Sequence, residues 1–133
     1  YTYALEHGYK ILALAHHLDD AAESFFMNFS HNGSLRSMPP IYKAENGLHV
    51  IRPLIHVRER SLRECAKEHA LPIIGDEACP AMRFDVKMPI ARAQTKEMLA
   101  KMEHENKELF ISLRRAFENI HVSSFAQEKY LER

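Results

Sequence analysis

Short apolar runs alternate with amphipathic stretches over the first half of the chain. Residues 10–15 (KILALA) form an apolar run of the length that a buried strand in a parallel sheet has. Residues 48–51 and 71–74 are shorter runs of the same kind. Helical stretches begin at Asp20 and Ser61, each with a capping-box pattern that ends on Glu23 or Glu64. Strands that alternate with helices predict an α/β fold built on a parallel sheet.

Apolar side chains recur at helical spacing within these stretches, which predicts the faces that pack against a core. In the first stretch they are Ala22, Phe25, Phe26 and Phe29, and in the second Leu62, Cys65, Ala66 and Ala70. Beyond residue 80 two further helical stretches are expected, and the clearer one carries Leu109, Phe110, Leu113, Phe117 and Ile120. Residues 1–8 read as the end of a helix closed by Gly8, so we expect sequence upstream of Tyr1.

Charge and cysteine content limit which partners the protein can bind and in which compartment it is expected. The 18 basic and 18 acidic residues cancel, so any RNA binding would need a local basic patch. Two cysteines do not make a disulfide framework, which favours a reducing compartment. With no signal peptide and no apolar run of about 18 residues, we expect a cytoplasmic protein that does not enter the membrane.

Polar residues with ligand-binding chemistry follow the first predicted strand. His16, His17, Asp19 and Asp20 lie between that strand and a helix, at the sheet edge where ligands of open α/β sheets bind. The N-terminus of a helix favours the binding of phosphate. Carboxylate oxygens, such as those of Asp19, are suitable ligands for magnesium. A purely structural role is the alternative, with Asp20 capping the helix and His17 packed at the sheet edge. Zinc is disfavoured because no spaced His pair occurs.

Arg52 and Cys79 are two further candidates. Arg52 follows the second predicted strand, where it can clamp phosphate or an RNA backbone, or be an ordinary ion-paired arginine. Cys79 lies in a polar loop and is a nucleophile, a cluster ligand or an unremarkable thiol. Cys65 is predicted to be buried. A candidate basic rim for RNA surrounds Arg52: Arg36, Lys43, Arg58, Arg60 and Arg63.

The segment ALAHHLDDAAESFFMNF (residues 13–29) resembles the second signature of the PP-loop ATPases, which activate a tRNA base by adenylation. AHHLDD followed by AE also occurs in tRNA-lysidine synthetases. Three later features resemble the branch that thiolates tRNA cytidine at C2: HNGSLRSMPP, VIRPLIHVRE, and LPII with a cysteine five residues on. Together these features cover roughly residues 4–80.

The resemblance implies a Rossmann-like PP-loop fold, of which residues 1–80 are the C-terminal part and residues 81–133 a helical extension. It implies adenylation of cytidine by ATP and displacement of AMP by sulfur, with tRNA and a sulfur donor protein or sulfide as partners. His17, Asp19 and Asp20 would belong to the site for ATP and Mg²⁺, with Asp19 and Arg52 catalytic. Cys79 would be the third ligand of a [4Fe–4S] cluster.

Two signatures of that branch would lie upstream of Tyr1, namely the Ser-Gly-Gly-x-Asp-Ser phosphate loop and a C-x-x-C pair. We therefore expect this chain to be a fragment that is inactive alone and that exposes a sheet edge or forms a homodimer. The companion of Cys79 in the family's later C-x-x-C is replaced by Asp76 or Met82. Lysidine synthesis, which needs no cluster, and a non-catalytic domain that binds RNA or a partner remain as alternatives.

Overall fold

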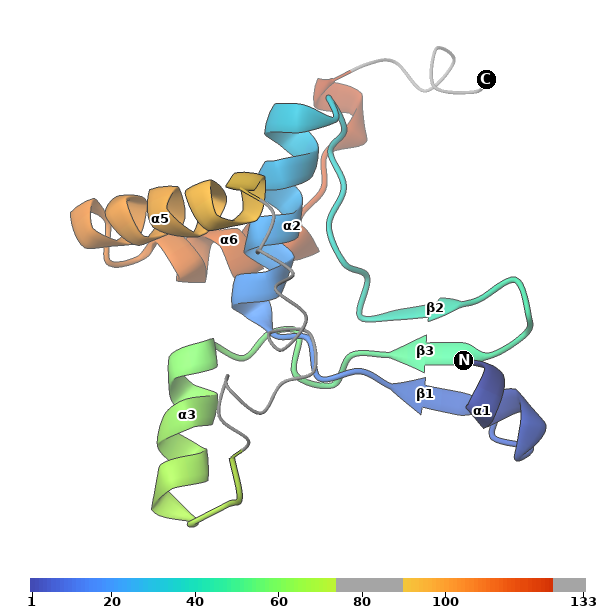
Figure 1. The fold of residues 1–133 in the computed structure, drawn as a ribbon. Coiled ribbons are helices and arrows are strands. Elements are labelled where there is room, and N and C mark those ends of the chain that lie inside the picture. The colour runs from blue at the N-terminus through green and yellow to red at the C-terminus, as the bar shows by residue number, and fades with distance from the viewer. Residues whose placement is uncertain (74–89, 126–133) are drawn as a thin grey trace.

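The computed structural model describes residues 1–73 and 90–125. Figure 1 shows a small sheet at one end of the molecule and a group of helices at the other. The elements are α1 (Thr2–Glu6), β1 (Ile11–Ala13), α2 (Leu18–His31), β2 (Ile41–Lys43), β3 (His49–Ile51), α3 (Glu59–Glu68), α5 (Ile90–Glu105), α6 (Leu109–Glu118) and the 3₁₀ turn η2 (Val122–Ser124). The α/β class predicted from the sequence is confirmed.

The sheet is mixed. Its order is β1-β3-β2, with β1 parallel to β3, as predicted, and β2 antiparallel to β3. Strand β2 was not predicted from the sequence. A turn closed by Ala44 N–H to the Leu48 carbonyl (2.8 Å), with Gly47 at φ +85°, joins β2 and β3 as a hairpin. Within the described residues β1 pairs on one side only, so it is an edge strand.

Helix α3 corrects three expectations. It begins at Glu59, before the predicted capping box at Ser61, and none of its residues is buried. Cys65, predicted to lie in the core, is exposed. Residues 71–73, part of the strand predicted at 71–74, form no strand, while residue 74 lies outside the described range. An isolated amphipathic pattern predicts a helix face but does not specify whether another element covers it.

The C-terminus of α3 closes in a Schellman motif without glycine. Leu71 N–H donates to the Ala66 carbonyl and Ala70 N–H to the Lys67 carbonyl, while Ala70 has φ +48°. A left-handed backbone costs a residue with a Cβ about 1–2 kcal/mol. Ala70→Gly should therefore raise the free energy of unfolding by about 0.5–1 kcal/mol in urea titrations. Ala93→Gly, at an exposed position inside α5, should lower it, and an equal loss at both positions would contradict the account.

The hydrophobic core lies between α2, α5 and α6, which lie side by side in Figure 1. Its buried members are Leu18, Ala22, Leu99, Phe110 and Leu113. The stripe predicted on α6 is thus confirmed, except that Ile120 lies beyond the helix and is 73% exposed. Phe29, predicted for the core face of α2, is exposed as well. The C-terminal helices therefore share one core with the helix that follows β1.

Candidate functional site

The loops that follow β1 and β3 are bonded to each other along their length. Leu14 N–H donates to the Ile51 carbonyl (2.9 Å) and Leu18 N–H to the Val57 carbonyl (2.9 Å). We call residues 14–20 and 51–59 the strand-end junction. It lies at the carboxyl ends of two parallel strands, which is the edge where open α/β sheets bind ligands. The structure therefore brings together the two segments from which the sequence analysis drew most of its candidates.

Arg52 contacts the histidine motif directly. Its Nε–H donates to His16 Nδ1 (3.2 Å), which requires that ring nitrogen to be unprotonated. Its Nη1 donates to the Pro39 carbonyl (2.8 Å), and the guanidinium lies 5.3 Å from the centre of the Tyr42 ring. Two of the five N–H groups of an arginine are used in these bonds. Arg52 thus joins the loops after both strands and the segment before β2.

A capping box at His17 and Asp20 starts helix α2. His17 N–H donates to Asp20 Oδ2 (3.0 Å), and Asp20 N–H donates to His17 Nδ1 (3.4 Å). The predicted box paired Asp20 with Glu23 and is wrong, because the helix begins two residues earlier, at Leu18. The structural role considered for Asp20 is therefore present. Arg92 of α5 also donates to Asp20 Oδ1 (3.0 Å) and to the buried Glu23 Oε2 (2.9 Å).

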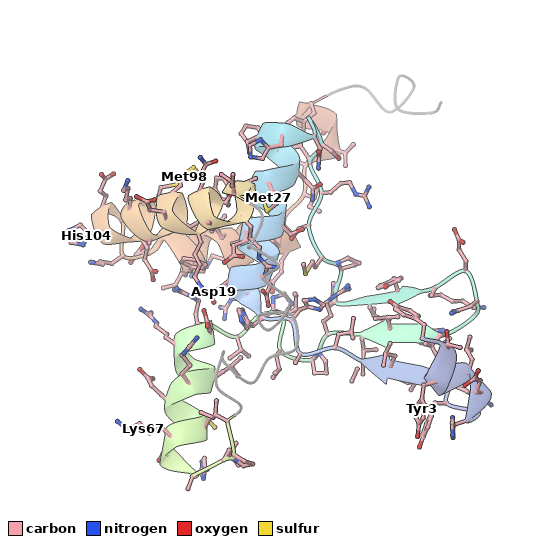
Figure 2. The ribbon with its side chains drawn as sticks, in the orientation of Figure 1. Tyr3, Asp19, Met27, Lys67, Met98 and His104 are labelled. Carbon is pink, nitrogen blue, oxygen red and sulfur yellow. The ribbon has the colours of Figure 1, made fainter. Side chains whose placement is uncertain are left out.

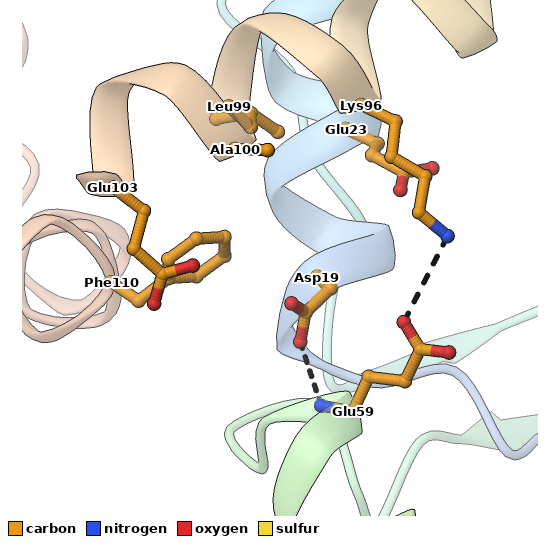
Figure 3. Close-up of a pocket in the computed structure, with 8 residues that line it drawn as sticks. All are labelled: Asp19, Glu23, Glu59, Lys96, Leu99, Ala100, Glu103 and Phe110. Carbon is orange, nitrogen blue, oxygen red and sulfur yellow. Dashed lines mark hydrogen bonds and ion pairs between the residues drawn. The ribbon is translucent and has the colours of Figure 1, made fainter.

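Asp19 caps a different helix from the one it belongs to. Its Oδ2 accepts the N–H of Glu59 (2.8 Å), at the start of α3, where Arg58 provides no side-chain cap of its own. The same carboxylate accepts three N–H contacts from Arg58 at 3.1–3.3 Å. Burial raises the pKa of Asp19, but the hydrogen bonds from Arg58 and Glu59 outweigh it and hold that pKa below its ordinary value. Figure 3 shows Asp19 directed at the first turn of α3.

Arg58 occupies the centre of this arrangement. Besides Asp19 it binds Glu103 of α5 through two bonds, Nη1 to Oε1 (2.7 Å) and Nη2 to Oε2 (3.0 Å). Its guanidinium carbon lies 3.4 Å from the centre of the Phe110 ring of α6. The side chain is only 16% exposed, so both ion pairs are sheltered from water. Figure 2 places Asp19 where α2 approaches the start of α3.

These ion pairs make folding sensitive to acid. Burial lowers the pKa of Arg58, but its bonds to Glu103 and Asp19 outweigh burial and raise that pKa above its ordinary value. The hydrogen bond from Arg58 in turn lowers the pKa of Glu103. A lowered folded-state pKa stabilises the fold above the ordinary carboxyl value of about 4, and this stabilisation is lost as pH falls below it. We expect unfolding free energy from urea titrations to drop between about pH 5 and pH 3.

Glu103→Gln tests that expectation, because glutamine cannot titrate. The variant should be less stable than the wild type at pH 7 and should lose less stability on acidification. Glu45→Gln, at an exposed position outside the ion-pair network, should follow the wild-type curve. If Glu103→Gln and the wild type lose the same stability between pH 5 and pH 3, the Arg58–Glu103 pair does not contribute to the acid sensitivity.

Metal ligands are not gathered in the part of the chain that the structure describes. No group of three or more His, Cys, Asp or Glu side chains there has the geometry to hold an ion. Each oxygen of Asp19 already accepts two N–H contacts, which saturates the carboxylate. Cys79, Asp76 and Met82 lie outside the described residues, so the cluster ligand stays a prediction.

A cavity of about 590 Å³ opens beside the junction, between α2, α6 and the segment before β2. Its lining includes Phe25, Phe117 and Pro39, and the carbonyl of Pro39 is the one that Arg52 binds. Of the predicted basic rim, Arg36 lines this cavity and Arg60 and Arg63 are exposed on α3, whereas Arg58 is enclosed. Lys43, the remaining member, is exposed on β2.

Residues 1–94 match the family model of the PP-loop domain. The match covers most of the chain and both loops of the strand-end junction, so the chain belongs to the PP-loop family. It extends into α5, beyond the domain boundary predicted at residue 80, and that boundary stays a prediction. None of the helices in residues 1–73 and 90–125 is long and apolar enough to cross a membrane.

Among curated proteins, the chain is similar to several named tRNA-cytidine(32) 2-sulfurtransferase. The protein of Geobacter metallireducens is 40% identical over 121 residues, which cover 90% of this chain and 46% of the relative. That of Pseudomonas putida is 35% identical over 133 residues, or 99% of this chain and 47% of the relative. That of Coxiella burnetii is 35% identical over 121 residues. The chain thus spans about half the length of these relatives.

Proposed function

We propose that this chain is part of a cytoplasmic, ATP-dependent enzyme that replaces the C2 oxygen of a tRNA cytidine with sulfur. The observation that carries the proposal is the likeness to three tRNA-cytidine(32) 2-sulfurtransferases over at least 90% of the chain. In the reaction the cytidine O2 attacks the α-phosphate of ATP and pyrophosphate leaves. This adenylation converts a poor oxygen leaving group into a good one. Sulfur, from a donor protein or sulfide, then attacks C2 and AMP leaves with the former O2.

The strand-end junction is suited to hold the anionic nucleotide. Arg52 is fixed by His16 and Pro39 and keeps further N–H groups for a phosphate or for the RNA backbone. The carboxylates at the start of α2, which would repel a triphosphate, are neutralised by Arg58 and Arg92. We therefore assign the ATP side of the site to His17, Asp19 and Asp20, with Arg52 contacting the phosphates or the tRNA.

Magnesium would not be held by Asp19 in this arrangement, since Arg58 and Glu59 occupy its oxygens. We place no residue of the described chain on that ion. A [4Fe–4S] cluster, if Cys79 is a ligand, would bind and activate the incoming sulfur. The described residues contain only Cys65, which is exposed on α3, so the cluster rests on Cys79 and the family resemblance.

Lysidine synthesis is the second candidate, and the motif AHHLDD supports it equally. The similarity to 2-sulfurtransferases over most of the chain favours thiolation. The reading as a non-catalytic domain has no comparable support. The two enzymes differ in the nucleophile that attacks the adenylated base, which is sulfur in one and lysine in the other.

Product analysis tests the proposal. The native protein, incubated with tRNA, ATP and sulfide, should form AMP and pyrophosphate only when tRNA is present, and 2-thiocytidine should appear in equal amount. ADP as the product would exclude adenylation. Turnover that requires lysine in place of sulfide would move the assignment to lysidine synthesis.

A further inference from the structure

Four pairs of residues join the two halves of the strand-end junction through side chains or the start of a helix, and two of these pairs share the carboxylate of Asp19. Arg52 binds His16, and Leu18 N–H binds the Val57 carbonyl. Arg58 and the N–H of Glu59 both bind Asp19, which lies between His17 and Asp20 in the sequence. The position of the segment 16–20 relative to β3 is therefore set largely at Asp19.

From this geometry we infer that Arg58 is a positioning residue for the nucleotide site and acts through Asp19. The inference rests on the proposed function, since it assigns a task to the site where ATP is proposed to bind. Arg58 is bound to Asp19 and Glu103 and is only 16% exposed, so we assign it no direct contact with the nucleotide. It fixes the carboxylate between those two residues and thereby the backbone that presents them.

The shape of the guanidinium explains why an arginine is needed. One edge, Nε and Nη2, faces Asp19, while Nη1 and Nη2 face Glu103, and the flat face covers the Phe110 ring. Lysine carries a single ammonium group and cannot make both two-point contacts at once. Arg58 thus ties the nucleotide loop to α5 and α6, so the C-terminal helices support the site as well as the core.

A substitution at Glu103 distinguishes a positioning role of Arg58 from a contribution of Arg58 to stability alone. Among the described residues Glu103 is hydrogen-bonded to Arg58 and not to Asp19. Glu103→Gln weakens the link to α5 and leaves the Arg58–Asp19 contact in place. Arg63 offers a control, because it is an arginine of α3, five residues after Arg58, is 74% exposed and binds Glu59 at 2.6 Å.

The test is steady-state kinetics of tRNA-dependent AMP formation by the native protein and by R58K, D19N, E103Q and R63K, with melting temperatures recorded alongside. A loss of folded protein lowers the maximal rate and leaves KM unchanged. Misplacement of the nucleotide loop should raise KM for ATP by about tenfold in R58K and D19N and leave KM for tRNA unchanged. E103Q should melt at a lower temperature with wild-type KM, and R63K should match the wild type in both.

An unchanged KM for ATP in both R58K and D19N, with losses confined to the maximal rate, would overturn the inference. Because Asp19 is itself assigned to the ATP side of the site, the double variant R58K/D19N is measured as well. If Arg58 acts through Asp19, the double variant should raise KM for ATP no further than D19N alone, and independent, multiplied increases would also overturn the inference. Where R58K folds poorly, an unchanged KM for ATP in D19N overturns it. If the wild-type protein forms no AMP with tRNA, the proposed function has failed. The ATP dissociation constant, measured by calorimetry on the same variants, then decides separately whether Arg58 positions a nucleotide site.

Discussion

Replacing Cys79 with serine should reduce 2-thiocytidine formation to below detection. We propose, from the resemblance to the cytidine-thiolating branch, that this residue is the third cluster ligand. A serine hydroxyl neither ionises near neutral pH nor binds iron as a thiolate does. The expected loss exceeds that of any other single substitution considered above. It is measured as 2-thiocytidine formed per tRNA by the purified native protein, with iron and sulfide content determined on the same samples.

Cys65→Ser is the matched control, because Cys65 is the other cysteine of the chain and is exposed on α3. It should retain wild-type thiolation and iron content. Equal losses in both variants would indicate a general effect of removing a thiol, and full activity in Cys79→Ser would remove the residue from the mechanism. Full iron content without thiolation in Cys79→Ser would indicate that Cys79 acts as a nucleophile and not as a cluster ligand.

Replacing Leu99 with alanine should cause a large loss of stability. Leu99 is 4% exposed and packs in the cluster formed by α2, α5 and α6. Truncation of a buried leucine costs about 2–5 kcal/mol, because the transfer free energy is lost and a cavity remains. Since domains of this size are stable by about 5–15 kcal/mol, a large share of the total would be removed.

Met98→Ala controls for the change of helix composition, because Met98 is the neighbouring residue of α5 and is 39% exposed. Its unfolding free energy in urea should stay within about 1 kcal/mol of the wild type. If Leu99→Ala costs no more than Met98→Ala, α5 is not packed on α2 as the structure has it, and the helical extension would be a separate unit.

The order of the first elements could be predicted because it depends on local pattern. The run at residues 10–15 and the polar residues after it indicate a strand followed by a helix, and β1 and α2 occupy those positions. Gly8 closes α1 with φ +73°, as glycine does after a helix. Strand β2 was missed because it is three residues long, follows Pro39 and Pro40, and is defined by pairing with β3.

The ion pairs of the candidate site could not be predicted, because their partners are distant in sequence. Arg58 is 39 residues from Asp19 and 45 from Glu103. Arg58 was predicted to be one member of a candidate basic rim for RNA, and the fold encloses it instead. The start of α3 could not be predicted for the same reason, because the carboxylate that caps this helix belongs to Asp19 in the loop after β1. A local capping box at Ser61 was the only signal within reach of a sequence window.

Nucleoside mass spectrometry of tRNA from cells that lack the gene is the most direct test of the proposed function. The account predicts selective loss of 2-thiocytidine, restored by the wild-type gene and not by the Cys79→Ser variant. Persistence of 2-thiocytidine at its normal level in the deletion strain would contradict the account, and loss of lysidine in its place would assign the protein to the other tRNA-modifying branch.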